Sequence, residues 1–122
     1  MINSRRKGHS FERLIVKDFK EIGYTRAERT QEGSKSDRDG IDIMNAGEWR
    51  PQCKVGAKYC QPKIINEVYC RNGIPIVITK ADRQGTLAIL KWKDMITIMK
   101  RLMEHGEMKQ EQMDMLINQK AV

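Results

Sequence analysis

The chain lacks any long apolar run, so the sequence predicts no helix that spans a membrane. No stretch reaches the roughly 18 consecutive apolar residues that such a helix needs. Residues 1–7, MINSRRK, also lack the apolar centre of a secretory signal peptide. We therefore expect a cytoplasmic protein without a membrane partner.

Cysteine is scarce as well, and its spacing argues against a disulfide framework and against zinc. The cysteines at positions 53, 60 and 70 form an odd set in a chain without an export signal, which favours free thiols. Structural zinc sites usually place ligands in pairs about two to four residues apart. Here the gaps are longer, and only the distant His9 and His105 are available to complete a site.

Internal repeats and low-complexity linkers are also missing, so the 122 residues suit one compact domain. We assign residues 1–122 to a single domain, with a core at about 4–91 and C-terminal helices at about 92–118. The net charge of +7, from 23 basic and 16 acidic residues, favours a polyanionic partner. Charge alone names no function, so it needs a chemical site beside it.

Helical periodicity is clearest in two segments. Ser10 is placed to cap a first helix that ends at Gly23 and carries the apolar residues Phe11, Leu14, Ile15, Phe19 and Ile22. Residues 92–103 return to the same periodicity, and a last helix is expected at 107–118. Residues 62–70 suit a further helix with proline in its first turn.

Strand patterns lie between these helices. We expect strands at 24–30, 41–44, 49–55, 74–79 and 86–91, with a polar, glycine-flanked loop at 31–40. The turn Asn45-Ala46-Gly47-Glu48 suggests that 41–44 and 49–55 form an antiparallel hairpin. The order αβββαββα predicts an α/β domain, in which helices flank a mixed sheet.

The expected hairpin carries residues suited to phosphodiester hydrolysis. This reaction needs a divalent cation, an activated water and positive charge near the developing phosphorane. Asp42 and the side-chain carbonyl of Gln52 supply oxygen ligands for Mg²⁺, or for Mn²⁺ in its place, while a backbone carbonyl and waters complete the octahedron. Side chains alternate across a strand, so Lys54 shares a face with Gln52 and acts on the same phosphate.

Glu12 is a further candidate, because it borders the apolar face of the first helix. From there it would bind the metal directly, bind it through water, or orient the attacking water, roles between which the sequence does not choose. Each acid or lysine alone is more often an ordinary surface charge. Their combination carries the prediction.

In order and spacing these residues resemble the PD-(D/E)XK nuclease superfamily, especially the small archaeal-type Holliday junction resolvases. The resemblance covers roughly residues 4–80. Its pieces are Gly8-His9-Ser10-Phe11-Glu12, Gly33-Ser34-Lys35-Ser36, Ile41-Asp42-Ile43 and Gln52-Cys53-Lys54. It implies a restriction-endonuclease-like αβββαβ core, a magnesium-dependent site at Glu12, Asp42, Gln52 and Lys54, and Ser34 or Ser36 near the cleaved phosphate.

Two positions depart from the pattern of the superfamily. Ile41 stands where proline is usual, and Gln52 replaces the usual glutamate, as in the similar VRR-type nucleases. Because Gln52 is neutral, it coordinates magnesium more weakly than a carboxylate does. The fold is therefore better supported than cleavage.

Basic residues surround the candidate site in the sequence. Contacts to phosphate position DNA without reading its bases, which suits an enzyme that recognises DNA shape. The residues that we expect to hold the DNA backbone are Arg5, Arg6, Lys7, Ser34, Lys35, Arg38 and Lys58.

The resulting hypothesis is a homodimeric, magnesium-dependent endonuclease that cuts branched DNA, above all four-way junctions. A resolvase needs two active sites related by a two-fold axis, which is why we expect a homodimer. The nearest alternative is a flap or single-strand nuclease. Two others are a non-catalytic nucleic-acid-binding protein that keeps the fold, and a basic structural protein whose match is accidental.

Overall fold

The structure is a computed structural model and describes residues 4–106 and residue 115. Its elements form a small mixed α/β protein with an N-terminal helix, two sheets and a C-terminal helix. They fall into two compact units, one up to Lys91 and one from Trp92. The assignment of residues 1–122 to a single domain stays a prediction.

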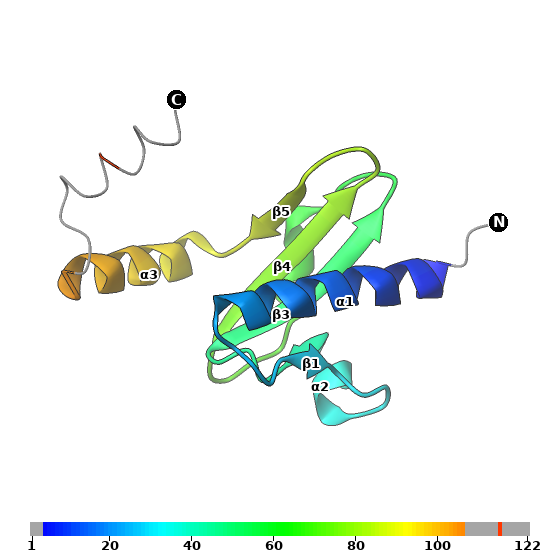
Figure 1. Ribbon diagram of the computed structural model, residues 1–122, viewed down its shortest axis with the longest axis horizontal. Coiled ribbons are helices and arrows are strands. Elements are labelled where there is room, and N and C mark those ends of the chain that lie inside the picture. Colours follow the sequence, from blue (N-terminus) through cyan, green and yellow to red (C-terminus); the bar gives the residue numbers. More distant parts are fainter. Residues whose placement is uncertain (1–3, 107–114, 116–122) are drawn as a thin grey trace. The chain divides into compact units, whose positions relative to one another are not determined.

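Helix α1 (Ser4–Ile22) covers one face of the larger sheet, as Figure 1 shows. Phe11, Ile15 and Phe19 are buried and pack with Ile43 and Ile78 in the core. The predicted apolar stripe is thus confirmed at Phe11, Ile15 and Phe19. It is wrong at Leu14 and Ile22, which are 59% and 71% exposed. The backbone N–H of Gly23 donates to the carbonyls of the last turn, so the helix ends where the sequence predicted.

The predicted start of this helix at Ser10 is wrong. The helix begins at Ser4, and Ser10 is an exposed residue within it. Arginine and lysine are good helix formers, so the basic residues before Ser10 extend the helix. Ion pairs fasten this extension, since Arg5 contacts Glu32 and Lys7 Nζ lies 3.0 Å from Asp82 Oδ1.

The larger sheet is mixed and has the strand order β3-β4-β5. Strand β3 (Trp49–Gly56) pairs in parallel with β4 (Ile74–Ala81), and β5 (Thr86–Ile89) pairs antiparallel with β4. The predicted buried strand at 74–79 is confirmed, whereas the strand predicted at 86–91 is shorter. Two short strands, β1 (Glu28–Arg29) and β2 (Ile43–Met44), form a separate antiparallel pair.

The predicted antiparallel hairpin between 41–44 and 49–55 is wrong, because β2 pairs with β1 and β3 pairs with β4. Within segment 41–44, the bonds to β3 are made by Asp42. The Asp42 N–H donates to the Pro51 carbonyl over 2.8 Å, and the Cys53 N–H donates to Asp42 Oδ2 over 2.7 Å. The Asp42 carboxylate therefore accepts the hydrogen bond from the Cys53 N–H, which would otherwise be available to a neighbouring strand.

Two segments between strands also differ from expectation. A short helix α2 (Lys35–Arg38) lies within the predicted loop at 31–40 and is capped by Ser34. The segment predicted as a helix at 62–70 is the shorter 3₁₀ helix η1 (Pro62–Glu67). The chain leaves the helix there because the Tyr69 N–H donates to the Asp39 carbonyl, 2.8 Å away.

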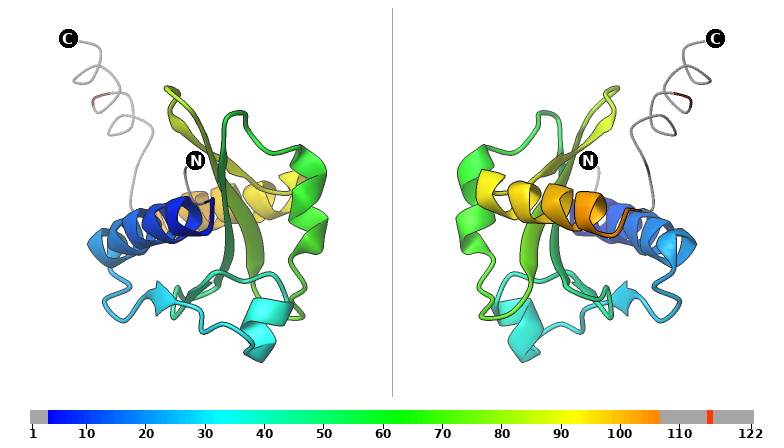
Figure 2. Two further views of the ribbon diagram at one scale, coloured as in Figure 1. Left: turned by 90° about the vertical axis from the view of Figure 1, so that its right-hand side faces the viewer. Right: turned by 90° about the vertical axis from the view of Figure 1, so that its left-hand side faces the viewer.

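Helices α1 and η1 cover opposite faces of the larger sheet, as the two side views show (Figure 2). Ile65 and Val68 are buried on the η1 side, as are the facing β4 residues Val77 and Thr79. The site residues on β3 thus lie at the edge of a sheet whose two faces are both covered.

The second unit contains α3 (Trp92–Glu104), which confirms the helix predicted at 92–103. It has no buried residue. The helix predicted at 107–118 lies outside the described residues, except for Met115. Among the helices that the structure describes, none is long and apolar enough to cross a membrane.

Candidate metal and nucleic-acid site

Asp42 is fixed at the edge of β3 that faces away from β4. Its backbone N–H and its carboxylate bond to the residues immediately before and after Gln52, at 2.8 and 2.7 Å. Its carbonyl accepts a third bond from the Thr30 N–H at 2.9 Å. Because three bonds from two segments hold this residue, its carboxylate has a defined position beside Gln52.

The same carboxylate is electrostatically strained. The pKa of Asp42 is raised from 3.8 to about 6, mainly by burial and in addition by the nearby Glu12 carboxylate. The Cys53 N–H and the charge of Lys54 act in the opposite direction. The Asp42 carboxylate is partly removed from water and lies near a second carboxylate, that of Glu12, so a bound cation would stabilise its charged form.

Gln52 provides an oxygen with no protein partner. The residue is only 6% exposed, and its Oε1 atom is buried without a hydrogen bond. Leaving such a carbonyl unpaired costs about 1–3 kcal/mol. The only other buried side-chain atom in this condition within the described residues is Thr30 Oγ1, on the residue that bonds to the Asp42 backbone.

The alternation along β3 agrees with the sequence prediction. Cys53 packs against the α1 core, while Gln52 and Lys54 fall on the other side of the strand. Burial and the carboxylates of Asp42 and Glu12 raise the pKa of the Cys53 thiol, so this cysteine stays neutral.

Glu12 reaches the site from α1 but is occupied by Arg29, whose Nε lies 2.7 Å from Glu12 Oε2. The side chains of this ion pair are largely buried, at 18% and 27% exposure. The pairing of Arg29 with Glu12 was not predicted, since the two residues lie on different elements. The Arg29 guanidinium thus occupies one oxygen of the Glu12 carboxylate.

A cation would therefore depend mainly on Asp42 and Gln52. Within residues 4–106 and 115, His, Cys, Asp and Glu side chains form no group of three that would hold a metal ion. Asp42 and the unpaired Gln52 carbonyl nevertheless fit a hard cation, because both present oxygen and neither is fully satisfied by the protein. This pair of ligands carries a single negative charge, which limits its affinity for a divalent cation.

Several of the predicted DNA contacts have partners within the protein. Arg5 pairs with Glu32, and Lys7 pairs with Asp82. The Ser34 hydroxyl donates to the Gln31 carbonyl over 2.7 Å and accepts from the Asp37 N–H over 3.2 Å, which explains it as a helix cap. The predicted contacts that are exposed are Arg5, Arg6, Lys35, Arg38 and Lys58.

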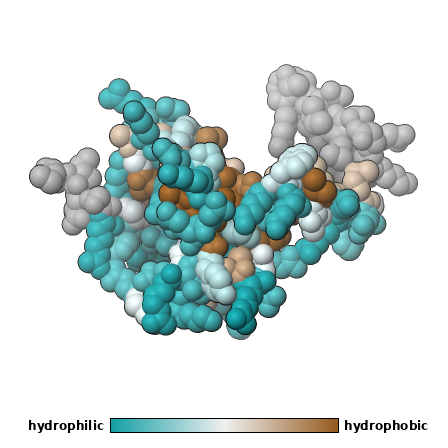
Figure 3. Space-filling view, turned by 180° about the vertical axis from the view of Figure 1, so that it is seen from behind, coloured by the Kyte–Doolittle hydropathy of each residue, from teal (hydrophilic) through white to brown (hydrophobic). Residues whose placement is uncertain are grey.

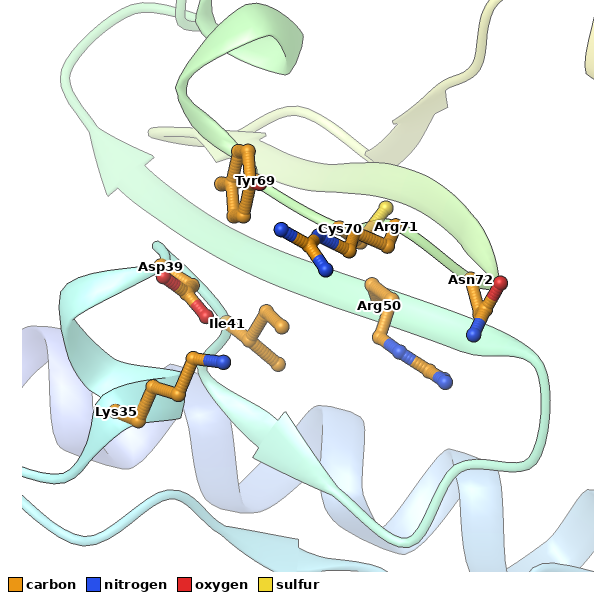
Figure 4. Close-up of a pocket in the computed structure, with 8 residues that line it drawn as sticks. All are labelled: Lys35, Asp39, Ile41, Arg50, Tyr69, Cys70, Arg71 and Asn72. Carbon is orange, nitrogen blue, oxygen red and sulfur yellow. The ribbon is translucent and has the colours of Figure 1, made fainter.

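A polar pocket of about 380 Å³ borders the site and was not predicted (Figure 4). Lys35, Asp39 and Ile41 form one wall, and residues 69–72 form the other, with Arg50 of β3 between them. These segments lie far apart in the sequence, so no local pattern could have revealed the pocket. In Figure 3, hydrophilic side chains dominate the lower part of the face that is shown.

In comparisons with known proteins, no family model, no curated protein and no solved structure matches this chain.

Proposed function

We propose that this chain is a metal-dependent DNA endonuclease of the PD-(D/E)XK superfamily, with a restriction-endonuclease-like fold. The observation that carries the proposal is the position of Asp42, whose carboxylate has a raised pKa, between bonds to the two neighbours of Gln52, whose side-chain carbonyl has no partner. Both lie at the free edge of β3, with Lys54 two residues further along the strand. The net charge of +7 supports a polyanionic substrate.

Each residue has a role in this proposal. Asp42 and Gln52 hold Mg²⁺, or Mn²⁺ in its place, and a bound cation supplies polarisation of the phosphoryl group. Lys54 stabilises the negative charge that develops on the phosphate. Glu12, oriented by Arg29, positions water next to the phosphate. The exposed cations Arg5, Arg6, Lys35, Arg38 and Lys58 hold the DNA backbone.

The proposed substrate is branched DNA, above all the four-way junction cut by resolvases. Symmetric cutting of a junction requires two copies of the site, so the proposal includes a homodimer. The nearest alternative is a flap or single-strand nuclease, in which the same residues would cut a different DNA structure.

Cleavage of labelled four-way junction, flap, single-stranded and linear duplex DNA tests this proposal. With Mg²⁺ or Mn²⁺ we expect symmetric junction cutting, and we expect Asp42→Ala and Lys54→Ala each to slow it by about 100-fold or more. Lys17→Ala is the matched control, because Lys17 is an exposed lysine of α1. Equal rates in all these variants would contradict the assigned site.

One observation favours a second function, a nucleic-acid-binding protein without catalysis. The two proposed protein ligands carry a single carboxylate between them, because Gln52 is neutral. Tight junction binding without cutting in either metal would select this function and identify Gln52 as the suspected cause.

A further inference from the structure

The pocket beside the site has walls of contrasting chemistry. Tyr69 presents an aromatic ring and is 57% exposed. The cations Lys35 and Arg71 and the carboxylate of Asp39 line the same space. Figure 4 shows the Lys35 amine and the Arg71 guanidinium pointing into the gap between the two walls.

Arg50 lines this pocket, but part of its guanidinium is already bonded to the backbone. Its Nη1 atom donates to the carbonyls of Gly47 and Trp49 at 2.7 and 2.9 Å. In Figure 4 its guanidinium points away from Tyr69, so its aliphatic stem forms the floor. The cations that remain for a ligand are therefore Lys35 and Arg71.

This combination fits a nucleotide better than a bare anion. Phosphate needs only the two cations, whereas the Tyr69 ring offers a surface for stacking a base. The Asp39 carboxylate accepts hydrogen bonds from the amino groups that bases carry at their edges. The volume of about 380 Å³ is within the range of small-ligand pockets.

The pocket lies next to the residues of the proposed cleavage site. Ile41 lines it and directly precedes Asp42, while Arg50 and Gln52 share one face of β3 about 7 Å apart. Gly40 joins the two regions, because a Cβ at this position would lie 3.5 Å from Gln52 Nε2. The bond from the Tyr69 N–H to the Asp39 carbonyl, 2.8 Å long, fixes the two walls relative to each other.

We propose that the pocket binds one unpaired nucleotide of the DNA strand, next to the phosphate at Asp42. Its base stacks on Tyr69 and its phosphate lies between Lys35 and Arg71. The position next to the cleaved phosphate rests on the proposed function, whereas nucleotide binding rests on the pocket alone. A base in a continuous duplex is stacked between its neighbours, so the pocket selects strands with an unpaired nucleotide at the branch.

Photocrosslinking tests the proposal without requiring cleavage. The probe is a short single-stranded DNA with one 5-iododeoxyuridine, compared with the same strand in a duplex, both in EDTA. We expect crosslinking to Tyr69 from the single strand, reduced about fivefold or more in the duplex. Tyr59, whose hydroxyl bonds to the Gly85 carbonyl, is an aromatic control within the same protein.

Binding of the same single strand to variants provides the second readout. Tyr69→Ala should weaken binding about fivefold or more, whereas Tyr69→Phe keeps the ring and should bind like the parent. Arg71→Gln should weaken binding, and Arg13→Gln, an exposed arginine on α1, should not.

The outcomes separate this inference from the proposed function. If branched DNA is cleaved but Tyr69 does not crosslink and Tyr69→Ala has no effect, the proposal of nucleotide binding in the pocket is overturned and the proposed nuclease function remains. A Tyr69-dependent crosslink in a protein that never cuts DNA would support the pocket and remove the nuclease. Absence of binding to any of these DNAs would overturn both.

Discussion

At the scale of single residues, the buried carboxylate of Asp42 couples the site to folding. Its pKa of about 6 lies above its ordinary value of 3.8, so the folded chain binds its proton more tightly than the unfolded chain does. Stability contributed by this proton is present below pH 3.8 and is lost as the pH rises to about 6. The loss amounts to at most about 3 kcal/mol.

Asp42→Asn should therefore make the metal-free protein more stable than the parent at pH 7, and the gain should shrink toward pH 4. The reason is that asparagine can still accept the Cys53 N–H but never carries the buried charge. Urea denaturation at pH 4, 5, 6 and 7 in EDTA measures this difference. A gain that does not vary with pH would mean that the charge of Asp42 is not the cause.

Gln52→Glu restores the charge that the resemblance to PD-(D/E)XK nucleases would predict. We expect tighter binding of Mg²⁺, because a carboxylate is a stronger ligand for a hard cation than an amide. We also expect lower stability without metal, since the new charge is buried beside Asp42. Magnesium titrations of cleavage and of thermal unfolding measure both effects, with Gln61→Glu, on an exposed glutamine, as control.

At the scale of elements, Gly40 sets how closely α2 and η1 approach each other. It has a φ of +79°, and a Cβ at this position would lie 2.8 Å from the Glu67 carbonyl oxygen. The contact is to backbone, so it cannot be relieved by rotating a side chain. The spacing between the pocket and Gln52 therefore depends on glycine here.

Gly40→Ala should reduce the free energy of unfolding by about 2 kcal/mol or more, as both strain and crowding oppose it. Gly33→Ala is a matched control, because Gly33 has a φ of +78° and no atom within 4 Å of the added carbon. Chemical denaturation of both variants measures the difference. Equal losses would mean that backbone strain acts alone and that the Glu67 contact does not matter.

Sequence reasoning at this scale succeeded where the pattern is local. The apolar spacing of α1 and the run that forms β4 could be recognised without their partners. Most of their apolar residues are buried as expected, although Leu14 and Ile22 are exposed. The prediction of a hairpin at 41–55 was wrong, because a turn-like sequence does not reveal that the Asp42 side chain bonds to the edge of β3. The Glu12–Arg29 pair and the pocket beside the site were not predicted, since their members come together only in the fold.

At the scale of the whole molecule, the excess of basic residues should dominate DNA affinity. A chain with a net charge of +7 should release counterions from DNA, so its affinity should fall steeply with salt concentration. Lys58→Ala should weaken binding to all DNAs alike and lower the slope of log affinity against log salt by about 1. Fluorescence anisotropy across a salt series measures this slope, with Lys17→Ala as control.

The edge of β3 also affects the tendency of the protein to aggregate. An open strand edge invites pairing with another chain and hence aggregation. On β3, Pro51 has no N–H to offer there, and the Asp42 carboxylate occupies the N–H of Cys53. The acid assigned to catalysis thus also discourages edge-to-edge aggregation, and Asp42→Asn, which keeps an acceptor, should precipitate less readily than Asp42→Ala.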